Sequence, residues 1–135
     1  MGSPSGDIRK LRALIVEDND MFRETVKEIL QTLFPSIAID EATKGVEALR
    51  KVDLHHPELI FMDISLPEEN GLQLTRKIKA GHPDTRIIVL TDYDILEYRE
   101  AALRCGASHF ISKSPLDWKE LEKSVTSLLP NLKKP

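Results

Sequence analysis

Short apolar runs alternate along this chain with longer amphipathic stretches, and the alternation predicts strands and helices in turn. The runs are rich in Ile, Val, Leu and Phe and end at polar or turn-forming residues, which is typical of strands buried on both faces. In the stretches between them, apolar residues recur three and four positions apart, the pattern of a helix with one buried face. The predicted strands are 11–16, 37–39, 59–63, 86–90 and 109–112, and the predicted helices are 21–34, 46–52, 72–80, 95–105 and 115–129.

Residues at the ends of these stretches support the helices. Asp20 precedes the first predicted helix as a possible N-cap, and Pro35 ends it. Pro115 is expected to open the last helix, because proline at a first helical position sacrifices no hydrogen bond. The apolar stripes of these two helices consist of Phe22, Val26, Ile29, Leu30 and Leu33, and of Trp118, Leu121, Val125 and Leu128.

Strict alternation of strand and helix predicts an α/β fold. Successive βαβ units form a parallel sheet with helices on both faces. We expect a single domain over 9–130. The Gly- and Ser-rich residues 1–8 are expected to be a disordered or cloning-derived leader, and 131–135 a short tail.

Composition and charge narrow the class of protein. The 135 residues are 41% hydrophobic and 30% charged, which suits a globular domain. A net charge of −3 gives no field that favours nucleic acid or an acidic membrane surface. The single cysteine, Cys105, fits a reducing compartment. No apolar stretch approaches the roughly 18 to 20 residues that span a bilayer, and no signal peptide is evident, so we expect a cytoplasmic protein.

Polar side chains end four of the five apolar runs. Glu17 and Asp18 close the first run, Asp63 the third, Thr91 the fourth and Lys113 the fifth. Open α/β sheets bind their ligands at the carboxyl ends of the strands. The sequence therefore places three acids, a hydroxyl and an ammonium at what could be one edge.

This set of groups points to phosphoryl chemistry. Magnesium prefers oxygen ligands and takes one or two carboxylates while sharing phosphate oxygens, so Glu17, Asp18 and Asp63 could hold Mg²⁺. An aspartate can also act as a nucleophile and form an acyl phosphate. Phosphoryl transfer needs positioning and charge neutralisation above all, and Lys113 and Thr91 could serve the phosphoryl oxygens.

Further short motifs stand in order with these residues: Glu41-Ala42 with Gly45, Glu47, Ala48 and Leu49; Leu66-Pro67 and Gly71; Leu90-Thr91; and Gly106-Ala107 followed by Phe110 and Lys113. With the acidic pair in Ile15-Val16-Glu17-Asp18 and with Asp63, they make the chain resemble the receiver domain of two-component response regulators. The resemblance covers about Leu11 to about Leu129.

The resemblance implies a fold and a metal site. The fold would be flavodoxin-like, a (βα)5 doubly wound parallel sheet with strand order 2-1-3-4-5. Mg²⁺ would be bound by Asp18, Asp63 and, often through water, Glu17, together with the backbone carbonyl of Ser65. Asp63 would be the phosphoacceptor, and the phosphoryl donor a histidine kinase or phosphotransfer protein.

The resemblance also implies a switch. Thr91 and Lys113 would bind the phosphoryl group of Asp63, and movement of Thr91 would make space for Phe110 to turn inward. The domain would catalyse its own phosphorylation and slow dephosphorylation, and its product would be a signal. That signal would pass to an output domain or partner, such as a helix-turn-helix DNA-binding domain, and phosphorylation could drive dimerisation.

Three departures from the family pattern leave alternatives open. Glu17 replaces the commoner aspartate. Asp92 follows Thr91; it would oppose phosphorylation if it pointed inward, or cap the helix near Ile95 if it pointed to solvent. Ser114 stands where many members have a proline after a cis peptide bond.

Two other functions compete with the switch. A receiver-like adaptor that no longer cycles phosphate would fit the departures at Asp92 and Ser114. A Mg²⁺-dependent phosphatase with an aspartyl nucleophile would share the chemistry, but such enzymes usually have a second acid two positions after the nucleophile. Ser65 occupies that position here, which argues against the phosphatase.

Overall fold

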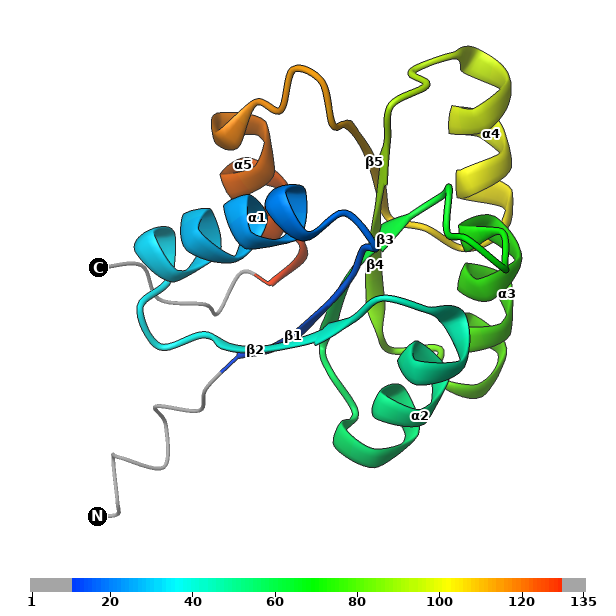
Figure 1. Ribbon diagram of the computed structural model, residues 1–135, viewed down its shortest axis with the longest axis horizontal. Helices are drawn as coiled ribbons and strands as arrows, with labels where there is room; N and C mark the ends of the chain where they lie inside the picture. Colours follow the sequence, from blue (N-terminus) through cyan, green and yellow to red (C-terminus); the bar gives the residue numbers. More distant parts are fainter. Residues whose placement is uncertain (1–10, 130–135) are drawn as a thin grey trace.

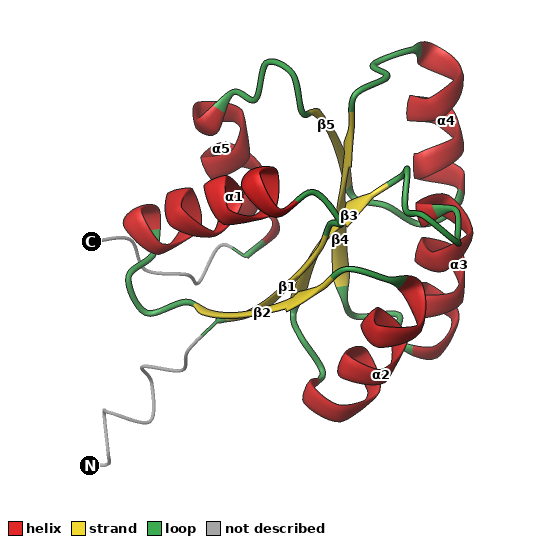
Figure 2. Cartoon of the chain, in the orientation of Figure 1, coloured by secondary structure: helices red, strands yellow, loops and turns green. Residues whose placement is uncertain are grey.

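A parallel sheet runs through the middle of the molecule with helices on both of its faces, as Figures 1 and 2 show. The computed structural model describes residues 11–129, and the expected leader 1–8 and tail 131–135 lie outside them. The strands are β1 (Arg12–Val16), β2 (Ala38–Ala42), β3 (Leu59–Asp63), β4 (Arg86–Thr91) and β5 (His109–Ser112), and the helices are α1 (Asp20–Leu33), α2 (Gly45–His55), α3 (Gly71–Gly81), α4 (Leu96–Arg104) and α5 (Trp118–Leu128). The strand order β2-β1-β3-β4-β5 confirms the expected topology.

The central strands divide the core into two layers. Side chains alternate along a strand, so Ile60 and Met62 of β3 face one side and Leu59 and Phe61 the other. The first side packs against α2, α3 and α4, and the second against α1 and α5 (Figure 1). All five residues of β3 are buried, as expected for a parallel strand covered on both faces.

Polar caps shift two helix starts away from the prediction. The side chain of Asn19 accepts a hydrogen bond from the backbone N–H of Phe22, so Asn19 is the N-cap of α1 and Asp20 its first residue. Asp117 caps α5 in the same way, and the helix begins at Trp118. The prediction that Pro115 opens this helix was therefore wrong; Pro115 lies in the preceding loop, after a cis peptide bond from Ser114.

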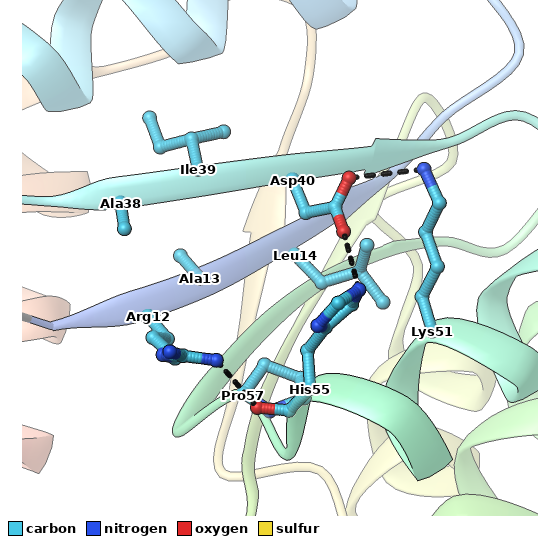
Figure 3. A pocket seen from close by; sticks show the side chains of 9 residues that line it. All are labelled: Arg12, Ala13, Leu14, Ala38, Ile39, Asp40, Lys51, His55 and Pro57. Atoms are coloured by element: carbon cyan, nitrogen blue, oxygen red, sulfur yellow. Dashed lines mark hydrogen bonds and ion pairs between the residues drawn. The ribbon is translucent and has the colours of Figure 1, made fainter.

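β2 is longer than predicted because its charged residues are paired. Asp40 lies 2.9 Å from the ammonium of Lys51 and 3.9 Å from the ring of His55, on the wall of a pocket of about 400 Å³ between β2 and α2 (Figure 3). Glu41, on the opposite face, accepts a 2.8 Å hydrogen bond from Arg23 of α1. Because the flanking helices supply cations, polar residues continue the edge strand beyond the apolar run at 37–39.

None of the helices within residues 11–129 combines the length and the apolar character needed to cross a membrane.

The loop after β3 folds tightly over the end of that strand. The N–H of Gly71 donates a 2.8 Å hydrogen bond to the carbonyl of Ile64, and Ser65 forms a β-bridge with Asn70. A Cβ atom on Gly71 would clash with the carbonyl oxygen of Asp63 and would come 2.8 Å from the Cα of Ile64. Glycine at this position lets the first turn of α3 approach the backbone of Asp63.

We expect Gly71→Ala to lower the free energy of unfolding by about 1–3 kcal/mol, because the added methyl group meets backbone atoms that cannot move aside easily. Urea unfolding followed by circular dichroism measures the change. Gly81→Ala is the matched control, since no described atom lies within 4 Å of its added Cβ and alanine favours a helix. An equal loss of stability in both variants would contradict the steric explanation.

Candidate functional site

The carboxyl ends of β1, β3, β4 and β5 bring the predicted polar residues to one edge of the sheet. In the register of the strands, Val16 pairs with Met62, Asp63 with Leu90, and Thr91 with Ser112. Glu17 follows the end of β1 and Lys113 the end of β5. The parallel pairing therefore assembles residues that lie far apart in the sequence, as the strand ends predicted.

Three carboxylates form a cluster at this edge. Glu17, Asp18 and Asp63 each offer an oxygen within 4.8 Å of the others. Glu17 is 0% exposed and Asp63 3% exposed, whereas Asp18 is open to solvent. Hard oxygen ligands from two buried acids and one exposed acid are a donor set that suits a small divalent cation such as Mg²⁺.

Lys113 brings a positive charge into this cluster. Its Nζ lies 2.8 Å from Oε1 of Glu17 and 3.6 Å from Oδ2 of Asp63, and its side chain is only 9% exposed. Burial lowers the pKa of Lys113, but the close ion pair with Glu17 and the charge of Asp63 outweigh this and raise it above its usual value. The ammonium is therefore held in its charged form beside the two buried acids.

Glu17 is the acid whose protonation the fold changes most clearly. Burial raises its pKa to about 7, and the charge of Asp63 acts in the same direction. The ion pair with Lys113 and a 3.0 Å hydrogen bond from the N–H of Asn19 favour the charged form and offset only part of this rise. The carboxyl group of Glu17 therefore changes its protonation near neutral pH.

Asp63 is fixed by the loop that follows it. Its Oδ1 accepts a 3.0 Å hydrogen bond from the N–H of Ser65, while Oδ2 faces Lys113. Ser65, the predicted backbone ligand, thus lies directly against the carboxylate of Asp63. The structure brings together Glu17, Asp18, Asp63, Ser65 and Lys113 as the sequence predicted.

Thr91 and Phe110 are the two residues predicted to act as a switch. The Thr91 hydroxyl is buried and accepts a 2.9 Å hydrogen bond from the N–H of Tyr93, which leaves its own proton to be donated. Phe110 is 5% exposed, and the guanidinium of Arg99 lies 4.9 Å from its ring centroid. Because Phe110 already lies inside, the expected inward turn does not describe this conformation.

Asp92 and Ser114 are the two other departures from the family pattern, and the structure shows the position of each. Asp92 is exposed, and its charge contributes to the raised pKa of Lys113. It does not cap α4, because the N-cap is Ile95 and no side chain among residues 11–129 caps this helix; the capping alternative was wrong. The cis peptide bond lies between Ser114 and Pro115, one position after the Lys113–Ser114 bond considered from the sequence.

Sequence reasoning missed two residues of α1 that support the site. Arg23 donates to the carbonyl of Glu17 at 2.9 Å and also binds Asp20 and Glu41, each at 2.8 Å. The spacing of Asp20 and Arg23 was an available signal, because residues three apart share a helix face. Phe22 lies with its ring centroid 4.8 Å from Nζ of Lys113, and its place in an apolar stripe concealed this contact.

Comparison with known families and structures gives consistent results. The model of the response regulator receiver domain matches residues 13–126. Oxygen regulatory protein NreC of Staphylococcus carnosus (strain TM300) is 39% identical over 108 residues, which cover 79% of this chain and 50% of NreC. The chain spans about half the length of the curated relatives it matches.

Solved structures agree with the fold. A two-component response regulator of the LuxR family from Aurantimonas sp. SI85-9A1 is 27% identical, with a TM-score of 0.83 over 93% of this chain and 89% of that one. A CheY-like response regulator receiver domain protein from Methanospirillum hungatei JF-1 is 30% identical, with a TM-score of 0.81 over 91% of this chain and 97% of that one.

The raised pKa of Glu17 predicts a pH-dependent loss of stability. Between about pH 4.5 and about pH 7 the unfolded chain has released this proton while the folded protein still holds it, so the free energy of unfolding falls as the pH rises. The shift corresponds to a loss on the order of 3 kcal/mol. Glu17→Gln should lack this fall.

Urea unfolding of both proteins at several pH values, with a chelator present, measures the effect. The difference between the Gln variant and the wild type cancels the titration of the other groups. Parallel stability curves for the two proteins would show that burial does not perturb Glu17.

Proposed function

The chain belongs to the family of response regulator receiver domains, and we propose that it is a phosphorylation switch whose phosphoacceptor is Asp63. The observation that carries the proposal is the position of Asp63. Its carboxylate is buried at the end of β3, within reach of two other acids and of the ammonium of Lys113. The donor would be the phosphohistidine of a sensor histidine kinase or phosphotransfer protein.

In the proposed transfer, a carboxylate oxygen of Asp63 attacks the phosphorus of the donor. A phosphorus–oxygen bond forms while the phosphorus–nitrogen bond breaks, and the bonding electron pair leaves with the donor imidazole. A carboxylate nucleophile has no proton to lose, so no general base is needed. The domain would catalyse this transfer through positioning and charge, and also the later slow hydrolysis, in which water removes the phosphoryl group as inorganic phosphate and restores the carboxylate of Asp63.

Lys113 and Thr91 would receive the new phosphoryl group. The Nζ of Lys113 is shared between Glu17 and Asp63, and a dianion on Asp63 would draw it away from Glu17. The hydroxyl of Thr91 can donate a hydrogen bond to a phosphoryl oxygen, whether or not it keeps the hydrogen bond that it accepts from the N–H of Tyr93. These two residues would convert the added charge into a local rearrangement.

The acidic cluster fits Mg²⁺. Asp18 and Asp63 would bind it directly, Glu17 through water, and Ser65 through its backbone carbonyl. When bound, the cation neutralises part of the charge on the phosphoryl oxygens. The charge balance supports this assignment, because the described residues gather three carboxylates at this edge and Lys113 pairs with two of them, Glu17 and Asp63.

The signal would leave the site through Thr91, Phe110 and α4. Thr91 ends β4, directly before the loop to α4, and Arg99 of α4 lies over the ring of Phe110. A change at Thr91 would bias the position of this helix and the surface around it. The recipient would be an output domain or partner, with a helix-turn-helix DNA-binding domain as the proposed form. We also propose that phosphorylation promotes dimerisation and that the protein is cytoplasmic.

Asp63→Asn should abolish phosphorylation by acetyl phosphate and Mg²⁺, because an amide cannot act as the nucleophile. Intact-protein mass spectrometry should show one base-labile phosphoryl group on the wild type. Asp53→Asn is the matched control, since Asp53 lies on α2, paired with His82, outside the acidic cluster. Equal labelling of Asp63→Asn would contradict the assignment.

The same assay separates the rival functions. A wild type that takes no phosphoryl group would favour an adaptor that does not cycle phosphate. Steady release of phosphate from a phosphate ester would favour a phosphatase.

Asp18→Ala should weaken Mg²⁺ binding more than Glu17→Ala, because a directly bound carboxylate contributes more than one that acts through water. Glu17 is also already paired with Lys113, whereas Asp18 is exposed. Isothermal titration calorimetry measures the affinities directly. Asp53→Ala is the control, because this acid of α2 pairs with His82 and lies outside the cluster. Unchanged affinity in both site variants would remove the proposed metal site.

A further inference from the structure

The ring of Phe22 lies against the ammonium of Lys113. The distance from Nζ to the ring centroid is 4.8 Å, within the range at which a cation is attracted to an aromatic face. Phe22 stands in the first turn of α1, and its backbone N–H donates a 2.8 Å hydrogen bond to the capping side chain of Asn19. The cap therefore fixes the place from which the ring reaches the site.

The ammonium of Lys113 has given up most of its water. Its side chain is 9% exposed, and two acids account for part of its surroundings, Glu17 at 2.8 Å and Asp63 at 3.6 Å. Loss of hydration is costly for a charged group unless other partners replace the water. The aromatic face offers an attraction that does not compete with the acids for the directed N–H bonds of the ammonium.

We propose that Phe22 is a positioning residue that keeps the ammonium of Lys113 beside Asp63. The ammonium of lysine is a point charge on a flexible four-carbon chain. To keep Nζ in one place, a neighbouring side chain must limit its movement in addition to the acids that pair with it. The charge of Asp92, which is exposed, also favours the charged form of Lys113. The ring of Phe22 keeps the ammonium of Lys113 within the site, where it can bind a phosphoryl oxygen on Asp63. This inference rests on the proposed function of the site.

Phe22 also packs against the apolar layer between the sheet, α1 and α5, so its removal could act through stability alone. The choice of variants separates the two roles. Phe22→Leu keeps an apolar side chain of similar reach and loses the aromatic face. Phe22→Tyr keeps that face. Ile29→Val trims another partly buried side chain of α1 that packs on the same layer, and it serves as the structural control.

The rate at which acetyl phosphate and Mg²⁺ label Asp63 is the measurement. A small donor avoids any contact that a kinase would make with α1. We expect Phe22→Leu to be labelled roughly fivefold more slowly than the wild type, and Phe22→Tyr and Ile29→Val within about twofold of it. Mg²⁺ affinity, from calorimetry, should be the same in all four proteins, because Phe22 acts on the ammonium rather than on the cluster of acids.

A Lys113→Ala background tests whether the effect passes through the ammonium. There, Phe22→Leu should cause no further slowing. A wild-type rate in Phe22→Leu, or equal slowing with and without Lys113, would overturn the positioning role while leaving the phosphoacceptor in place. Absence of labelling on Asp63 in the wild type would instead overturn the proposed function, and this inference with it.

Discussion

The contact between Lys113 and the buried acids is the interaction on which the rest of the site depends. Glu17 and Asp63 lie at the ends of neighbouring strands with almost no access to water, and like charges in such a place repel. One ammonium between them offsets part of the repulsion, but burial, with a smaller contribution from the charge of Asp63, still raises the pKa of Glu17. A site with unbalanced negative charge favours the binding of a further cation, and it favours any rearrangement that moves its negative charges apart.

The surrounding scaffold differs in rigidity from one side to the other. β3 and most of β4 are buried on both faces and hold the carboxylate of Asp63 and the hydroxyl of Thr91 in place. α4 buries only Ala102 among its residues, and Tyr93, Leu96 and Leu103 on and before it are exposed. Few buried contacts mean a low cost of local movement. A change at the rigid strand ends is therefore most easily accommodated by α4.

α1 contributes to the site from the other side of the sheet. Arg23 joins the backbone of Glu17 to Asp20 and Glu41, so the loop after β1 is held by a network rather than by one bond. Phe22, one position earlier, faces Lys113 instead. Two consecutive residues of one helical turn thus support the acids and the ammonium separately, because neighbouring positions on a helix point about 100° apart.

Hydrophobic pattern alone predicted the class of this fold and the polar residues that gather at the carboxyl edge of its sheet. Buried parallel strands must be apolar throughout, so a polar residue such as Asp63 or Lys113 marks a strand end wherever it closes an apolar run. The strand order came from the resemblance to receivers, since periodicity does not encode which strands are neighbours. Only the tertiary structure decided the extent of β2 and the contact of Phe22 with Lys113. In both of these cases the deciding partner lies elsewhere in the sequence: Lys51 and Arg23 pair with the acids of β2, and the pairing of β5 brings Lys113 to α1. The start of α5 is a local matter, because Asp117, directly before the helix, caps it. Local sequence determines the chemistry of each residue, whereas folding determines which distant charge or ring it contacts.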